Sequence, residues 1–168
     1  MKNKYKIFFF CTSFFLLFSN NIVNSNQSFT YEAQQIEIFD QGNIIKGEKE
    51  VKIIIGDSIT ITANELEYNR VSELVRLSGD IKLEDKINKI TLNTNELFYL
   101  KNDNKIYSES KTNFIFDERY FAETKSFIFY PTQEKLISED QVKIYDDLGN
   151  LFFINKFKYE IGKKVFSG

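Results

Sequence analysis

Two glutamates repeat at a spacing that raises the question of catalysis. Glu65 and Glu96 lie 31 residues apart, at equivalent places of a repeated pattern. Two carboxylates at a fixed separation in a groove are the machinery of a polysaccharide-cleaving enzyme. The neighbouring copies of the pattern, however, have Gln35 and Ser126 at this place, and all four residues fall on the polar side of the alternation. The sequence therefore predicts no catalytic residues, and an enzyme is the less favoured hypothesis.

The composition excludes several other kinds of chemistry. The chain of 168 residues has no His, and its single Cys is Cys11. A Ser-His-Asp triad, a Cys-His pair and a zinc site built from His or Cys are therefore excluded, and no disulfide framework can form. We predict no metal and no cofactor. The formal net charge is −2 and basic residues form no patch, so we predict no nucleic-acid partner.

The N-terminus has the layout of a secretory signal peptide. Lys2, Lys4 and Lys6 give a positive start, residues 7–18 are almost purely apolar, and a polar stretch up to Ser25 follows. This apolar run is too short to span a bilayer, which takes roughly 20 residues of helix. We therefore predict a signal peptide over residues 1–25, cleavage after Ser25 and export. With 42% hydrophobic residues, the remainder, 26–168, is expected to form a single domain with its own core.

The exported part alternates apolar and polar residues throughout, which predicts strands and no helix. The alternation itself repeats about every 30 residues. Its copies cover residues 29–53, 59–83, 90–114, 120–144 and, in part, 152–166. Each copy has the same interruption, which in the copy 59–83 lies between Ala63 and Leu66, where the apolar set changes from odd to even positions. One extra residue in a strand has this effect, so we predict a β-bulge or a corner there.

The repeat predicts an all-β fold. Each copy has room for two strands of about ten residues, and stacked copies form two facing sheets or one folded-over sheet with the apolar set inside. The inward positions expected to line this interior share the apolar phase of the repeat. They are Ile59, Ile61, Leu66, Tyr68, Val75, Leu77, Ile81, Leu83, Ile90, Leu92, Leu97, Tyr99, Ile106, Phe114, Phe127, Phe129, Leu136, Val142 and Ile144. We call these nineteen residues the predicted lining set.

The copy at 59–83 resembles the repeat of the OstA-like, or organic-solvent-tolerance, family. The segment ITANELEYN (61–69) followed by LVRLSGDIKL (74–83) is similar to the family pattern in which an "ADxxxY" strand leads through a turn into "vxaxGxVxv". The resemblance covers roughly residues 29–168. This sequence departs from the pattern at Asn64, where the family has Asp; we expect that position to orient the corner.

The resemblance implies a fold and a function. Members of the family form a V-shaped, open β-jellyroll in the periplasm of Gram-negative bacteria, and they belong to the machine that transports lipopolysaccharide. Their apolar interior shields the lipid acyl chains, and Lpt-type jellyroll domains join end to end through edge strands. Two kinds of member remain open for this chain: the free bridging protein, and the N-terminal domain of the outer-membrane assembly protein. We expect the chain to stop before its last strand and to be associated with the outer membrane if it is part of a longer chain.

The predicted lining set has two interpretations. It forms either a trough for acyl chains or the ordinary dry core of a β-repeat scaffold or adhesin. Ser108, Ser110 and Thr112 occupy inward positions of the third copy, which fits an incompletely dry cavity as well as a local defect. Bound lipid and association through both ends distinguish the trough from the scaffold.

Overall fold

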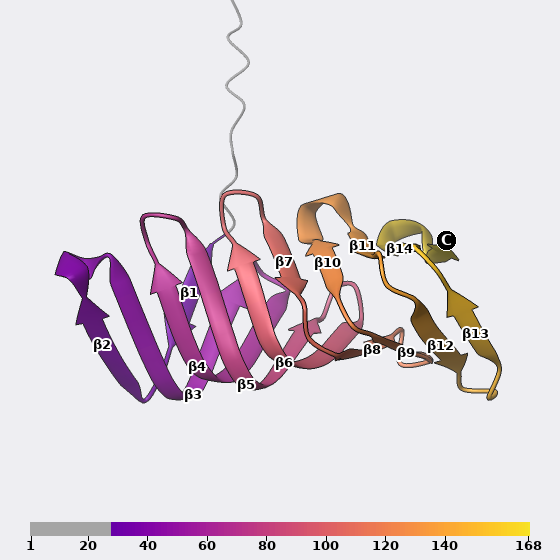
Figure 1. Cartoon of the computed structure of the whole chain (residues 1–168), viewed down its shortest axis with the longest axis horizontal. Helices are drawn as coiled ribbons and strands as arrows, with labels where there is room; N and C mark the ends of the chain where they lie inside the picture. The colour runs from indigo at the N-terminus through magenta and orange to yellow at the C-terminus, as the bar shows by residue number, and fades with distance from the viewer. Residues whose placement is uncertain (1–27) are drawn as a thin grey trace, which may run out of the picture.

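The structure is a computed structural model that describes residues 28–168, so the predicted signal peptide lies outside the described part. Fifteen strands form one antiparallel sheet, and three short 3₁₀ turns connect strands that follow each other in the chain (Figure 1). The strands are β1 (Phe29–Glu32), β2 (Gln35–Phe39), β3 (Ile44–Ile55), β4 (Ile59–Asn69), β5 (Leu74–Asp85), β6 (Ile90–Leu100), β7 (Lys105–Ser108), β8 (Thr112–Phe116), β9 (Tyr120–Thr124), β10 (Phe127–Tyr130), β11 (Lys135–Ser138), β12 (Val142–Asp146), β13 (Leu151–Ile154), β14 (Phe157–Glu160) and β15 (Val165–Ser167). The 3₁₀ turns are η1 (Asp40–Gly42), η2 (Pro131–Gln133) and η3 (Ile161–Lys163).

The sheet folds over along one line, which we call the corner, and so makes two walls. Strand β6 shows this clearly, because its first half pairs with β8 while its second half pairs with β7. Wall A consists of β2, residues 44–48, 65–69, 74–78 and 96–100 of the long strands, and β7, β10, β11, β14 and β15. Wall B consists of β1, residues 51–55, 59–63, 81–85 and 90–94, and β8, β9, β12 and β13. The side opposite the corner, where the turns within each wall lie, is called the mouth.

In β3 to β6 the chain passes through the corner without leaving the sheet. Pairing shifts register between Thr62 and Glu65, where the sequence predicts an interruption, and again between Ser78 and Ile81. In β4 the extra residue turns the inward phase from odd to even positions, whereas in β5 the inward positions are odd on both sides, so in both strands apolar residues stay inside beyond the bend. The predicted bulge is therefore confirmed, and strands of 11 or 12 residues fit the expected two strands for each copy.

Beyond β6 this expectation is wrong, because each long strand is divided into two strands of four or five residues. Local hydrogen bonds of side chains explain the division. The hydroxyl of Ser108 accepts a hydrogen bond from the backbone N–H of Ser110, and Ser138 does the same for Asp140. Such bonds offer the backbone an alternative to the ladder, so the strand ends at the corner.

The sheet does not close on itself. Within residues 28–168, β1 and β2 each pair only with β3, β13 pairs only with β12, and β15 pairs only with β14. Four strand edges are thus open, two at the N-terminal end and two at the C-terminal end. The expectation of an all-β, folded-over, open sheet is confirmed.

Candidate functional site

The interior between the two walls is one apolar cluster. All nineteen residues of the predicted lining set belong to it, and their side chains are at most 5% exposed. Val75, Leu83 and Phe129 are 0% exposed. The two walls therefore pack directly against each other in this structure, and a guest molecule would have to separate them.

The sequence analysis left several buried residues out of the lining set. Ile55 and Phe116 continue the inward alternation to the mouth ends of β3 and β8. Pro131 and Ile161 are buried from the 3₁₀ turns η2 and η3, so they cover the interior from outside the strands. The alternation of apolar and polar residues is enough to predict burial of Ile55 and Phe116. It predicts nothing for Pro131 and Ile161, because they lie in turns.

The interior is open to solvent at both ends of the molecule. At the N-terminal end, Ile36 pairs with Gly47 and Ile38 with Ile45, so the two isoleucines lie on the inward face, yet they are 46% and 66% exposed. At the C-terminal end, Phe152 pairs with the buried Ile144 and is 49% exposed. Inward apolar side chains thus lie uncovered where the sheet stops.

Polar groups at the corner hold the bend in the N-terminal half. Asn64 donates a hydrogen bond to Asp80 at 3.3 Å. It also lies against Gly79, whose φ of +76° suits glycine and at which an added Cβ would come within 2.7 Å of the Asn64 side chain. Asn64 therefore orients the corner, as the sequence analysis expected.

In the C-terminal half the corner is lined by buried hydroxyls instead. The set Thr94, Ser108, Thr112, Thr124 and Ser138, which we call the hydroxyl corner, is at most 6% exposed. Thr94 and Ser108 share a hydrogen bond of 3.3 Å, and Thr124 and Ser138 share one of 2.9 Å. Further bonds run to backbone carbonyls. The hydroxyls of Ser108 and Thr112 therefore have hydrogen-bond partners within the corner. In this structure they line neither a cavity nor a local defect.

A cluster of five side chains closes the mouth at the N-terminal end; we call it the clasp. Phe29 on wall B lies 5.4 Å from the Tyr68 ring and 6.0 Å from the Tyr99 ring, both on wall A. The ammonium group of Lys101 lies 5.0 Å from the Phe29 centroid and donates hydrogen bonds to the Tyr68 hydroxyl (2.7 Å) and to Glu73 (2.5 Å). Aromatic contacts and one charged group thus join the walls.

The clasp shifts the ionisation of its members. The hydrogen bond from Lys101 lowers the pKa of Glu73, and the bond from the Tyr68 hydroxyl acts in the same direction. Burial alone lowers the pKa of Lys101, but its hydrogen bonds to Glu73 and Tyr68 outweigh burial, and the net shift is upward. Burial raises the pKa of Tyr68. The ion pair is therefore favoured at neutral pH.

The mouth is also closed at the C-terminal end. Phe116 on wall B lies 4.9 Å from the Tyr159 ring on wall A, and Tyr120 lies 5.3 Å from Phe166. Lys164 and Asp117 form an ion pair of 2.8 Å between the two walls. Burial raises the pKa of Tyr159 to about 12. Both ends of the mouth are thus held by aromatic side chains and a lysine.

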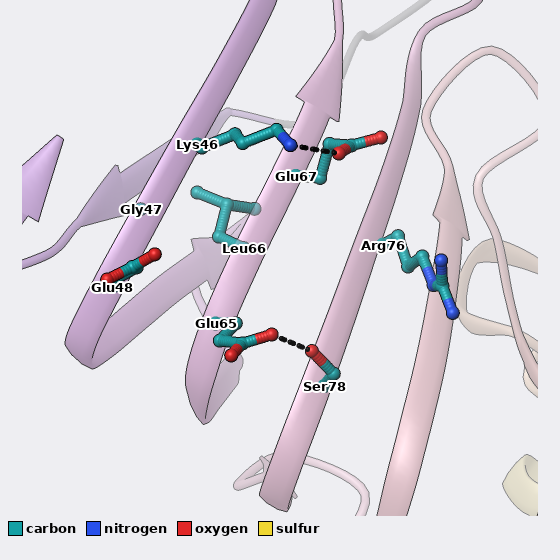
Figure 2. Close-up of a pocket in the computed structure, with 8 residues that line it drawn as sticks. All are labelled: Lys46, Gly47, Glu48, Glu65, Leu66, Glu67, Arg76 and Ser78. Carbon is teal, nitrogen blue, oxygen red and sulfur yellow. Dashed lines mark hydrogen bonds and ion pairs between the residues drawn. The ribbon is translucent and has the colours of Figure 1, made fainter. Parts of the chain in front are cut away.

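The outer face carries the glutamates that raised the question of catalysis. Figure 2 shows Glu65 accepting a hydrogen bond from Ser78 (2.8 Å) and, beside it, the Lys46–Glu67 ion pair (3.3 Å). Arg76 turns away from Glu65 and pairs with Glu96 at 2.6 Å on the next strand. Glu65 and Glu96 thus lie two strands apart in one row of the outer face, and each is held by its own surface partner.

Two further features of residues 28–168 bear on other functions. Among residues 28–168, His, Cys, Asp and Glu form no group of three or more that could hold a metal ion. The same residues include no helix long and apolar enough to cross a membrane. Arg70 and Arg119, for which the sequence predicts no role, lie in turns at the mouth.

Comparisons with known proteins complete the description. No curated protein matches this sequence. Among solved structures, the chain is similar to the crystal structure of LptH, described as the LptA homologous periplasmic component of the conserved lipopolysaccharide transport device from Pseudomonas aeruginosa. The identity is 16% and the TM-score 0.34, with 85% of this chain and 82% of that chain covered. The family model for OstA-like proteins matches residues 15–147, which is most of the sequence. The chain belongs to the OstA-like family.

Proposed function

We propose that the protein carries lipopolysaccharide through the periplasm, with the lipid acyl chains held between its two walls. One observation carries the proposal: a single apolar interior extends through the folded sheet, and its inward residues Ile38 and Phe152 lie uncovered at opposite ends. Family membership supports the proposal, because the resemblance to OstA-like repeats implies a role in lipopolysaccharide transport.

The mechanism is physical and needs no catalytic residue. Each buried methylene group gains about 0.8 kcal/mol, so a lipid with several acyl chains does not cross water unaided. An interior of uniform apolar character keeps the chains buried at every step of the passage. Because the lining residues now touch one another, the walls separate at the mouth to admit the lipid while the corner holds them together. The phosphates and sugars of the lipid then remain in water outside the mouth.

The contact set for the acyl chains is the predicted lining set. Its residues come from both walls, from β4 to β8 and from β10 to β12. The aromatic members Phe114, Phe127 and Phe129 make the middle of the interior bulky, with Phe114 and Phe127 meeting edge to face at 5.0 Å. We infer that these rings move aside together when lipid enters.

The open strand edges provide the second functional surface. An extended segment of a partner can pair with an edge strand and continue the sheet. We infer that other Lpt-type jellyroll domains pair with the sheet at its N-terminal end, where β1 and β2 flank β3, and with β13 and β15 at the other end, which makes the interior continuous between molecules. The predicted signal peptide supports export to the periplasm, as a bridging protein or as part of an outer-membrane assembly protein.

A non-catalytic scaffold is the second candidate, and a specific observation favours it. The interior is filled by its own side chains, with seven core residues at 0% exposure: Val75, Leu83, Leu92, Leu97, Ile106, Phe116 and Phe129. A dry core of this kind needs no guest. The two candidates differ in whether lipid contacts the inward face.

Two adjacent phenylalanines provide a matched test. Phe152 and Phe153 are 49% and 58% exposed, but Phe152 pairs with the inward Ile144 and Phe153 with the outward Lys143. A photoreactive residue replaces each in turn, and Phe127 in a third variant, in cells that make lipopolysaccharide. We expect lipopolysaccharide adducts at 152 and 127 and none at 153. Equal adducts at 152 and 153, or none at 152 in a folded protein, contradict the proposal and favour the scaffold.

A further inference from the structure

Strand β1 covers the interior at the N-terminal end but is itself weakly held. It has four residues, pairs only with residues 52–55 of β3, and none of its side chains is fully buried. The residues that it contacts are buried. Ile53 and Ile55, which pair with β1, are 1% exposed, and Tyr99, which faces Phe29 from wall A, is 3% exposed. β1 therefore protects a well-packed surface with few contacts of its own.

The same strand closes the mouth. Phe29, its first residue, is the wall B member of the clasp and contacts Tyr68 and Tyr99 across the mouth. Tyr31, two residues on, lies 6.2 Å from the Tyr68 ring. Removing β1 from β3 withdraws both aromatic rings from wall A, so the mouth loses its cover and Lys101 loses the Phe29 ring below its ammonium group.

The edge that β1 occupies is a docking edge for any strand of the same character. The backbone pairing from Phe29↔Ile55 to Glu32↔Lys52 is independent of sequence, and the inward positions 29 and 31 require only apolar or aromatic side chains. An extended segment with apolar residues at alternate positions can thus replace β1 at little cost, because it restores the backbone hydrogen bonds.

We propose that β1 is an exchangeable cover: an aliphatic strand of a partner protein, with no ring at the positions of Phe29 and Tyr31, displaces it from the wall B edge of β3, and this docking opens the mouth in the same step. The inference rests on the proposed function, since it names the event that admits lipid. It links partner binding to lipid entry through one strand, and the clasp is the contact that is broken.

The first test uses a synthetic peptide that copies β1, residues 28–33, with a fluorophore, and a disulfide that locks β1. The outward pair Thr30↔Ile54 joins β1 to β3, and Thr60↔Glu84 joins β4 to β5 on the same outer face. Each pair is replaced by cysteines in a chain with Cys11→Ser. We expect the peptide to bind the reduced Thr30→Cys/Ile54→Cys protein and to bind its oxidised form at least about tenfold more weakly. Oxidation of the Thr60→Cys/Glu84→Cys control leaves binding unchanged.

The second test measures opening of the mouth. Val75 is 0% exposed, lies on wall A and pairs with Tyr68 and Tyr99, so Val75→Cys is a thiol sensor under the clasp. A saturating peptide of residues 28–33 with Val at positions 29 and 31 keeps the apolar pairing but brings no ring to the clasp. It is expected to raise the rate at which a water-soluble reagent modifies this thiol about tenfold, since modification follows the open population. The peptide with the native Phe and Tyr restores the clasp contacts and has no such effect.

Three outcomes overturn the proposal. They are no binding of the β1 peptide to the reduced protein, equal binding to the oxidised one, and binding of the valine peptide with no change in Val75→Cys reactivity. None of these measurements contains lipid. Their failure is therefore distinguishable from failure of the proposed function, which the Phe152 and Phe153 cross-linking reports independently.

Discussion

The two halves of the sheet turn the same corner by different chemistry. In the N-terminal half, β3 to β6 run through it as strands of 11 or 12 residues, and the bend is made by backbone with positive φ, at Gly79 (+76°) and Asp80 (+45°) among others. In the C-terminal half the strands stop at the corner (Figure 1). Buried hydroxyls such as Thr124 and Ser138 hold the bend there. The same alternation of inward apolar residues is thus compatible with two ways of forming the corner.

The outer faces differ in the same way. Along wall A, the charged row Glu37, Lys46, Glu67, Arg76 of the N-terminal half ends at Phe98 on β6 and continues as Tyr107, Ile128, Ile137 in the C-terminal half. The Phe98 and Tyr107 rings stack with centroids 5.0 Å apart. Short strands have fewer ladder bonds, and outer aromatic pairs add cross-strand stabilisation. The N-terminal half is thus held by continuous backbone pairing and the C-terminal half by side chains.

The largest expected effect is the loss of a core ring in the C-terminal half. Phe129→Ala removes a side chain that is 0% exposed, and we expect it to lower the free energy of unfolding by about 3–5 kcal/mol. Because repeats are stabilised by their neighbours, hydrogen exchange is expected to lose protection in β7–β15 first and to keep it in β3–β6. Phe153→Ala, on the exposed outer face, is the control. Equal loss of protection throughout the sheet contradicts the difference between the halves.

The backbone corner of the N-terminal half is the next to test. In Gly79→Ala the new Cβ meets Asn64 at 2.7 Å and φ stays positive, so we expect a loss of about 2–3 kcal/mol in chemical denaturation. Gly149→Ala is the matched control, because φ there is +84° but nothing lies within 4 Å. Its cost is expected to be about 1 kcal/mol. If the two variants are equally stable, close packing at Gly79 contributes nothing to the corner.

The hydroxyl corner predicts a coupled pair. Ser138→Ala leaves the buried Thr124 hydroxyl without its 2.9 Å partner, and Thr124→Val does the converse. We expect each single variant to lose about 1–2 kcal/mol and the double variant to lose less than the sum. A double-mutant cycle by thermal or urea unfolding measures the coupling. Strict additivity means that the two hydroxyls do not stabilise each other.

The smallest effect concerns the clasp and depends on pH. Since the pKa of Glu73 is lowered in the folded protein, its contribution to stability is present above its unfolded value near 4.5 and is lost as the pH falls through the lowered folded value. The group is partly exposed, so we expect Glu73→Gln to cost about 0.5 kcal/mol at pH 7 and almost nothing at pH 2. Glu37→Gln on the exposed β2 is the control. If the stability difference between Glu73→Gln and the unchanged protein does not vary with pH, the effect of Glu73 does not come from its ion pair.

Much of the fold could be predicted from the sequence, because strand alternation reports directly on which face is buried. Every residue of the predicted lining set is buried, and the interruption between Ala63 and Leu66 is a real bulge. The division of the later strands could not be predicted from alternation, since Ser108 and Ser138 keep the inward phase while their hydroxyls redirect the backbone.

The clasp could not be predicted either. Glu73 and Lys101 lie in turns at the mouth, where no periodic pattern applies, and their distance of 2.5 Å depends on how two neighbouring hairpins of one wall are aligned. Phe29 fits the alternation, but its contact with Tyr99 joins positions 70 residues apart, across the fold. Contacts between the walls depend on how the sheet bends at the corner. The alternation of residues along one strand gives no information about that bend.

The central claim is that lipid enters between the walls, and a distance across the mouth tests it most directly. Spin labels at Asp57→Cys and Val71→Cys, in the mouth turns of wall B and wall A, report the opening, and labels at Asp57→Cys and Lys86→Cys, both on wall B, serve as control. On adding purified lipopolysaccharide to the Cys11→Ser background, we expect the first distance to lengthen and the second to stay the same. Lipopolysaccharide that binds without lengthening the first distance, or that does not bind the folded protein, contradicts the account.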